Sequence, residues 1–312
     1  MSSDVLVLLA AYNGSKYLKE QLDSIYASKF AGEFSLVVGL DPSTDNTRDV
    51  LLTYSRPLQL IEHSSPSGSA SQNFSRLMDY ARALEPEYCF FSDQDDVWFD
   101  DKMQASLDKL KEMEERFGVD VPLLVFSDAE VVDHDLKLIS PSFWQHEDLQ
   151  VDIISSFKNL AVQNVGQGCT FVFNKALLNK VRCIPEGVRM HDHWLMLVAS
   201  VFGRVDYMSR ATLKYRQHHL NVVGARGMGL MMAIERAFYK KDSISKALSA
   251  SQAQCAIFAK EYGADLESSQ FEFFESFSRL SSKKLFYRKI FCAKHKMRMA
   301  SLYRTVGLYL FV

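Results

Sequence analysis

The first 130 residues alternate between two hydrophobic periods, and this alternation limits the folds that the chain can adopt. Short apolar runs typical of buried strands are each followed by a segment whose apolar residues recur at helical spacing. Such alternation predicts an α/β fold with a mostly parallel central sheet covered by helices on both faces. The runs that predict strands are Val5–Leu9, Phe34–Leu40, Leu58–Ile61, Tyr88–Phe91 and Leu123–Phe126.

Three polar loops directly follow predicted strands. They contain Asn13, the segment Asp41–Asp45 and the segment Asp93–Asp96. In parallel sheets, ligands bind beyond the carboxyl ends of the strands, so these loops are expected to meet at one edge of the sheet. After residue 128 the pattern is weaker: Val165–Phe173 predicts a strand and Trp194–Phe202 a helix.

The loop Asp93-Gln94-Asp95-Asp96 places three carboxylates within four residues. Neighbouring carboxylates repel one another and are costly to bury without a cation. Hard oxygen ligands suit Mg²⁺ or Mn²⁺, which commonly bridge a protein carboxylate and a diphosphate. The alternative is a solvated acidic turn, but the preceding apolar strand favours the metal site.

An ordered set of short motifs resembles the family 2 glycosyltransferases, which have the GT-A fold, and in particular their bacterial rhamnosyltransferase-type members. The motifs follow one another in the family's order over about residues 4–224. They are Ala10–Gly14, Ser43–Thr47, Phe91–Trp98, Gly168–Thr170, His191–Trp194 and Tyr215–Gly224.

The resemblance implies roles for individual residues. Asp95 would be the main ligand of Mg²⁺ or Mn²⁺, with Asp93 on the ribose or the metal and His218 as a further ligand. Asp41 would bind the pyrimidine base, and Arg216 the diphosphate. The other implied nucleotide-sugar contacts are Ala11, Tyr12, Asn13, Asn73, Gln94 and Gly168. The alternative for His218 is an exposed histidine at a polar strand end.

Asp192 matches the family's catalytic base. The implied reaction needs one carboxylate that takes the proton of the acceptor hydroxyl as this hydroxyl attacks the anomeric carbon. The flanking His191 and His193 are candidates to tune it. The other interpretation of Asp192, compatible with the first, is a helix N-cap.

The C-terminal segment is strongly basic. From Ser276 to Val312 the chain has nine basic residues and no acidic one, although its net charge is only −2. Interleaved apolar residues predict a helix with one apolar and one cationic face, suited to an anionic membrane surface. The alternatives are packing on the catalytic domain or on the partner in a homodimer. No nucleic-acid-binding motif accompanies the charge, so a nucleic-acid partner is not expected.

Cysteine usage and the N-terminus predict a cytoplasmic protein, at the inner face of the cell membrane if the basic tail binds lipid. The five cysteines are scattered, odd in number and without a CxxC pair, which is typical of a reducing compartment. The N-terminus lacks a signal-peptide pattern.

The expected organisation is a GT-A catalytic domain over residues 1–227 and a helical extension over 228–312. The resemblance implies inverting transfer of a sugar, rhamnose from dTDP-rhamnose or else a hexose from a UDP-sugar, to a cell-surface glycan or lipid-linked acceptor. Two alternatives are a sugar-nucleotide nucleotidyltransferase and a non-catalytic glycan-binding module. The first normally has a glycine-rich loop with Arg and Lys, which Ala10–Gly14 lacks, and the second is disfavoured by the acidic loop and Asp192.

Overall fold

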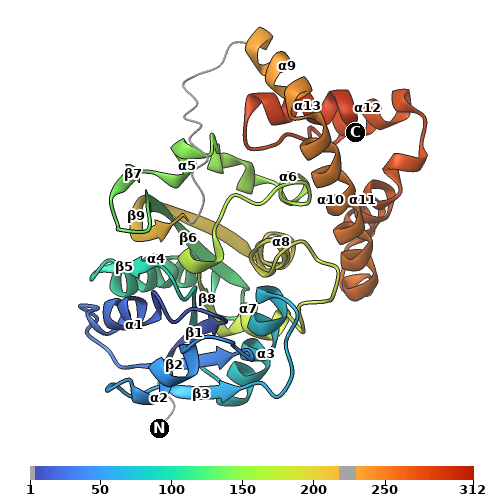
Figure 1. Cartoon of the computed structure of the whole chain (residues 1–312). Helices are drawn as coiled ribbons and strands as arrows, with labels where there is room; N and C mark the ends of the chain where they lie inside the picture. Colours follow the sequence, from blue (N-terminus) through green and yellow to red (C-terminus); the bar gives the residue numbers. More distant parts are fainter. Residues whose placement is uncertain (1–3, 218–229) are drawn as a thin grey trace.

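A computed structural model describes residues 4–217 and 230–312 (Figure 1). Within these residues one mixed sheet of nine strands forms the centre of the molecule, in the order β3-β2-β1-β4-β8-β6-β9-β5, with β7 beside β6. The predicted α/β fold is confirmed. The strands are β1 (Val5–Ala11), β2 (Phe34–Leu40), β3 (Gln59–Glu62), β4 (Tyr88–Ser92), β5 (Val97–Trp98), β6 (Leu123–Val132), β7 (Leu138–Ser140), β8 (Val172–Asn174) and β9 (Arg204–Arg216).

The N-terminal half of the sheet is parallel. β1 pairs in parallel with β2 and β4, and β2 with β3. The carboxyl ends of these strands therefore lie at the same edge, as the positions of the polar loops predict. The helices between them are α1 (Leu18–Tyr26), α2 (Thr47–Thr53), α3 (Ala70–Leu84) and α4 (Lys102–Phe117).

The side chains of β1 alternate between two hydrophobic clusters because successive residues of a strand point to opposite faces. Val5, Val7 and Leu9 pack with residues of α1 and α4, whereas Leu6 and Leu8 pack with residues of α3. Both faces of this strand are buried, which explains its continuous apolar run.

The second half of the sheet departs from the sequence expectation. The segment Val165–Phe173 is not one strand: the 3₁₀ helix η2 (Gly168–Thr170) precedes the short β8. β8 pairs antiparallel with both β4 and β6. The helices here are α5 (Phe143–His146), η1 (Val151–Ser155), α6 (Phe157–Leu160), α7 (Lys175–Lys180) and α8 (His191–Phe202).

The C-terminal region is helical, and it packs against α6 and α8 (Figure 1). Trp194 of α8 contacts Phe258 with ring centroids 5.4 Å apart, and Phe157 of α6 contacts Phe273 at 5.5 Å. The expected boundary at residues 227 and 228 lies outside the described residues. The helices are α9 (Leu230–Tyr239), α10 (Lys241–Tyr262), α11 (Ser268–Ser278), η3 (Leu280–Ser282), α12 (Leu285–Lys294) and α13 (Leu302–Phe311).

The basic tail is divided between α12 and α13, which the turn after Lys294 separates. Its apolar residues Phe291, Cys292 and Leu308 are buried in the same cluster as Trp194. The tail packs mainly on α9, α10 and α11, and the segment between α12 and α13 donates main-chain hydrogen bonds to Asn159 and Gln163 of the expected catalytic domain. Packing on the catalytic domain, one of the alternatives for this tail, is therefore correct in part. Among the described helices, none is long and apolar enough to cross a bilayer.

Candidate active site

A cavity of about 500 Å³ opens where the predicted polar loops converge. Pockets of this size hold small-molecule ligands in many proteins. Its lining includes most of the residues that the sequence assigned to nucleotide-sugar and metal binding, namely Ala11, Tyr12, Asp41, Asn73, Asp93, Gln94, Asp95 and Arg216. His218 lies outside the described residues.

Asn13 and Gln94 hold the loops of this cavity together. Asn13 has a left-handed backbone, with φ 48°, and its Oδ1 accepts a hydrogen bond from the Thr44 N–H at 2.8 Å. Gln94 bonds both main-chain groups of Tyr12: its Oε1 accepts from the N–H at 2.8 Å and its Nε2 donates to the carbonyl at 2.9 Å. The Tyr12 side chain is 53% exposed at the rim, so its ring has a free face for a flat ligand group.

Another wall of the cavity is formed by a loop to which the sequence analysis assigned no function. The carboxylate of Asp41 accepts hydrogen bonds from the Ser67 N–H, at 3.1 Å, and from the Ser67 hydroxyl. Asn73 donates through Nδ2 to the Gly39 carbonyl at 2.9 Å, which ties α3 to the end of β2. Pro66, Gly68, Ser69 and Ala70 complete this wall. The small polar residues after β3 were the signal for it.

The acidic loop holds the carboxyl groups of Asp93 and Asp96 close together in a buried position. Burial, together with the charges of Asp96, Asp95 and Asp192, raises the pKa of Asp93 well above its usual range. Burial and the neighbouring Asp95 raise the pKa of Asp96 to about 7. The buried ammonium of Lys102, whose pKa burial lowers to about 8, lies near Asp96.

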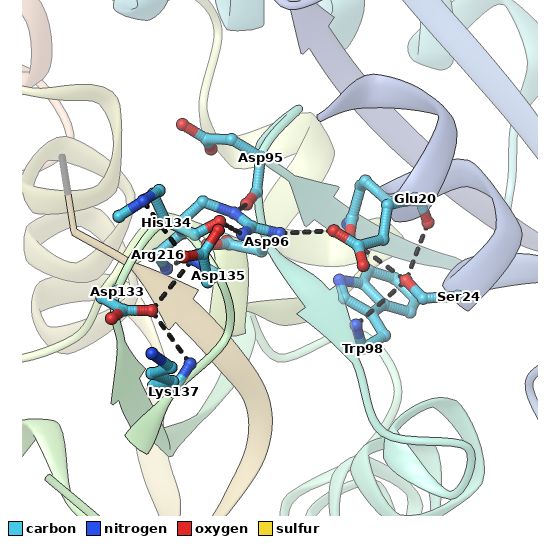
Figure 2. Close-up of polar contacts among 11 residues, drawn as sticks. Glu20, Ser24, Asp95, Asp96, Trp98, Asp133, His134, Asp135, Lys137 and Arg216 are labelled. Carbon is cyan, nitrogen blue, oxygen red and sulfur yellow. Dashed lines mark hydrogen bonds and ion pairs between the residues drawn. The ribbon is translucent and has the colours of Figure 1, made fainter. Parts of the chain in front are cut away.

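The arrangement of possible metal ligands differs in part from the predicted set. Carboxylate oxygens of Asp93 and Asp96 and the Sγ of Cys169 all lie within 4.8 Å of one another. The sequence treated Cys169 as a packing residue and did not single out Asp96. Asp95 also lines the cavity, and Figure 2 shows its carboxylate turned away from Asp96. Burial and mutual repulsion favour the protonated forms of Asp93 and Asp96, and a divalent cation between them would stabilise the charged forms. The residues present therefore fit a metal.

Asp192 lies in the first turn of α8, close enough to Asp93 for their charges to interact. Met190 holds the N-cap position, so the interpretation of Asp192 as the N-cap is wrong. Its carboxylate accepts hydrogen bonds from the Gly168 and His193 N–H groups and from the Asn164 side chain. Burial raises its pKa to about 6 in spite of these bonds, which puts it in the range of a general base. Gly168 thus bonds Asp192 and is not among the residues that line the cavity.

The two flanking histidines are neutral. Burial lowers the pKa of His191 to about 3, and its ring stacks on Phe74 at 4.1 Å. Burial also lowers the pKa of His193 to about 4, and its Nε2 lies 2.5 Å from the Leu160 carbonyl. They shape the surroundings of Asp192 without adding charge.

Arg216 has a protein acceptor for each guanidinium nitrogen (Figure 2). Its Nε donates to the Asp95 carbonyl at 2.9 Å, one terminal nitrogen to the His134 carbonyl at 2.5 Å, and the other to Glu20 at 2.5 Å. The guanidinium also stacks on Tyr17 at 4.2 Å. Arg216 therefore fixes the main chain of the acidic loop, and its predicted contact with a diphosphate stays a prediction.

We expect Arg216→Gln to lower the free energy of unfolding in urea by about 3 kcal/mol, because it removes three hydrogen bonds that a buried guanidinium donates. Arg216→Lys should recover little of this loss, since an ammonium does not reach three separated acceptors as a guanidinium does. The matched control is Arg210→Gln on the same strand. Arg210 pairs with Asp101 at 2.8 Å in an exposed position, so its loss should cost under about 1 kcal/mol. Equal losses for the two glutamine variants would contradict the role given to Arg216.

Comparisons with known proteins agree with this site. The model of glycosyl transferase family 2 matches residues 6–159. A dTDP-rhamnosyl transferase, RfbG of Shigella flexneri, is 29% identical over 230 residues, which cover 70% of this chain and 74% of that protein. An uncharacterized glycosyltransferase of Rickettsia typhi is 20% identical over 219 residues, and there the match spans 69% of this chain and 64% of the relative.

Solved structures show the same fold. S. aureus TarS 1–349 in complex with UDP-GlcNAc superimposes with a TM-score of 0.55 at 16% identity, over 98% of this chain and 90% of that one. A second S. aureus TarS structure superimposes with a TM-score of 0.57 at 17% identity, and the match covers 90% of this chain and 43% of that one. The matched relatives are glycosyltransferases, which argues against the two alternatives, a sugar-nucleotide nucleotidyltransferase and a non-catalytic glycan-binding module. Residues 6–159 match glycosyl transferase family 2, the chain has the GT-A fold, and the protein is a glycosyltransferase.

Proposed function

We propose that the protein transfers one sugar from a nucleoside diphosphate donor to an acceptor hydroxyl with inversion at the anomeric carbon. The observation that carries this is Asp192, a carboxylate with a pKa of about 6 next to the acidic loop of the nucleotide cavity. The preferred donor is dTDP-rhamnose, supported by the similarity to the RfbG dTDP-rhamnosyl transferase. A UDP-hexose is the second candidate.

The donor's nucleotide would lie in the cavity of about 500 Å³. The base would stack on the exposed Tyr12 ring and bond to Asp41, which the loop at Ser67 holds in place. The diphosphate would reach the acidic loop. Asp93 and Asp95 would hold Mg²⁺ or Mn²⁺ there, with Asp96 behind them and His218 as a further predicted ligand. Such an ion supplies charge neutralisation of a departing diphosphate.

Asp192 would take the proton of the acceptor hydroxyl while the hydroxyl oxygen attacks the anomeric carbon. The bond from this carbon to the diphosphate breaks on the opposite face, so one displacement inverts the configuration. Hydrogen bonds from Gly168 and Asn164 orient the carboxylate for this step. His191 and His193 are neutral, so they add no positive charge to that of Arg189 near the carboxylate.

The donor site predicts nucleotide binding that depends on metal and on Asp95. With Mn²⁺, dTDP or UDP at about 100 times its Kd should add about 2.7 kcal/mol of stability, or roughly 5 °C in Tm. Asp95→Asn should abolish this rise, as measured by thermal shift with GDP as the comparison nucleotide. Asp120→Asn, an exposed position just before β6 at the other edge of the sheet, is the control. A full rise in Asp95→Asn would contradict the assignment.

If Asp192 is the general base, its loss should slow the chemical step without weakening nucleotide binding. Asp192→Asn should lower kcat by about 10² to 10⁴ while leaving the nucleotide-induced rise in Tm intact. Because the raised pKa of Asp192 is about 6, the wild-type kcat/KM should fall about tenfold for each pH unit below 6, as the carboxylate becomes protonated. Steady-state rates between pH 4.5 and 8 test this. A profile that stays flat down to pH 5 would remove Asp192 from the reaction.

We also propose that the protein works at the cytoplasmic face of a membrane, where its acceptor is a cell-surface glycan precursor or a lipid-linked saccharide. The support is the exposed side of α12, where Phe286 is 78% and Ile290 47% exposed. Exposed Lys283, Lys284 and Lys289 surround them. Apolar side chains ringed by cations match the interface of an anionic bilayer.

Phe286→Ser/Ile290→Ser should weaken binding to phosphatidylglycerol vesicles by about tenfold in a co-sedimentation assay, because the buried apolar area is lost. Leu52→Ser, a change of an exposed leucine on α2, should have no effect. Wild-type protein should bind phosphatidylcholine vesicles weakly. If the wild type ignores anionic vesicles and elutes at twice its mass, this surface belongs to a homodimer instead.

A further inference from the structure

A second cavity, of about 390 Å³, lies between the helical C-terminal region and the catalytic part. It shares no lining residue with the nucleotide cavity. Its wall combines apolar groups with four cationic side chains and a single carboxylate, that of Glu147. The cations come from separate parts of the chain and are Arg189, Arg236, Lys240 and Arg304.

These cations are held in place but only weakly neutralised. The guanidinium groups of Arg236 and Arg304 both stack on the Tyr303 ring, at 4.3 and 4.9 Å. Their nearest carboxylates are 4.0 Å away, Asp148 for Arg236 and Glu147 for Arg304. Arg304 instead donates to the main-chain carbonyls of these two acidic residues, at 3.0 and 3.1 Å. A cavity whose cations are bound mainly by neutral groups keeps a net positive charge.

Two further features add to this charge. Lys240 is exposed and forms no ion pair with any described residue. It is also the N-cap of the 22-residue helix α10, whose N-terminus has no side-chain cap and has one acidic residue, Asp242, in its first turn. Ser243 and Ile244, in the first turn of this helix, line the cavity. The N-terminus of a long helix carries partial positive charge and free N–H groups that bind anions.

The cavity adjoins the candidate base. Arg189 lines the cavity and donates hydrogen bonds to the Val162 carbonyl at 3.2 Å and the Ser251 hydroxyl at 3.0 Å. It also lies near enough to Asp192 for their charges to interact. Gln163 also lines the cavity, and the next residue, Asn164, donates to Asp192. An anion in this cavity would therefore belong to a molecule that approaches Asp192 from outside the nucleotide site.

We propose that this cavity binds a phosphate or diphosphate group of the acceptor and thereby places the acceptor hydroxyl at Asp192. The inference rests on the proposed function, since it takes Asp192 to be the base. The two guanidinium groups match phosphate oxygens, and Lys240 adds a further charge. The apolar side chains of Ala247 and Met299 offer a surface for the part of the acceptor next to the phosphate.

The test uses inorganic pyrophosphate as the probe and the full-length protein in metal-free buffer, with binding measured by isothermal titration calorimetry. Wild type should bind one equivalent. Lys240→Gln should weaken binding by about threefold and Arg236→Gln/Arg304→Gln by more than about tenfold. Lys246→Gln, which removes an exposed lysine of the same helix that does not line the cavity, should bind like wild type.

Asp95→Asn, measured in parallel, separates this cavity from the nucleotide site. Binding that survives Asp95→Asn and falls in Lys240→Gln supports the inference. No binding by wild type, or equal binding by Lys240→Gln and Lys246→Gln, overturns it. The Lys240 variant decides the matter even if the double variant fails to fold, because Lys240 is exposed.

Two further arms separate the possible explanations. If phosphatidic acid vesicles bind in a Lys240-dependent way while pyrophosphate does not, the cations serve a lipid surface and the acceptor subsite is overturned. Nucleotide-induced stabilisation with Mn²⁺ tests the proposed function alone. Its failure with intact pyrophosphate binding would overturn the donor site, whereas the reverse pattern would overturn only the acceptor subsite.

Discussion

Repulsion among carboxyl groups at one edge of the sheet is the constraint around which this protein is arranged. Asp93, Asp95 and Asp96 follow β4, and Asp192 comes from the start of α8, so strands and helices distant in sequence must hold like charges close together. Their proximity raises the pKa of Asp93 and weakens the fold unless positive charge balances it. The chain supplies part of this balance through the buried Lys102 and through the Arg216 main-chain N–H, which donates to Asp96, and a divalent ion would supply the rest.

The donor half was predictable because its signals are local. β1, β2 and β4 are largely apolar runs because both of their faces are buried, and each is followed by a loop of polar residues. Parallel pairing then brings these loops to one edge. Asp41, Asp93 and Asp95 therefore share a cavity, as the sequence implied. The loop at Ser67 was visible as a polar stretch, but its bond to Asp41 depends on how β3 and α3 are placed.

The remaining contacts of the site were less predictable because they join segments that are far apart in the sequence. Nothing near Cys169 in the sequence indicates that its sulfur lies beside Asp93 and Asp96. Arg216 was predicted to bind the diphosphate because the sequence does not reveal its acceptors within the protein. These acceptors are Glu20, the Asp95 carbonyl and the His134 carbonyl, which come from three other segments. The basic tail was predicted to be amphipathic, but which of its apolar residues are buried depends on how it packs on α9, α10 and α11.

Helix α8 lies between the nucleotide-binding half of the sheet and the C-terminal helices, and it contacts both through His191 and Trp194. Its first turn presents Asp192, and Trp194 packs on Phe258 and Tyr262 of α10. Substitutions in the C-terminal helices therefore reshape the surroundings of the base without touching β1, β2 or β4, which hold the nucleotide loops. The surroundings of Asp192 and the loops of the nucleotide cavity are thus formed by different parts of the chain. Replacing segments of α10, on which Trp194 packs, is therefore a direct way to alter the surroundings of Asp192 while the nucleotide loops stay unchanged.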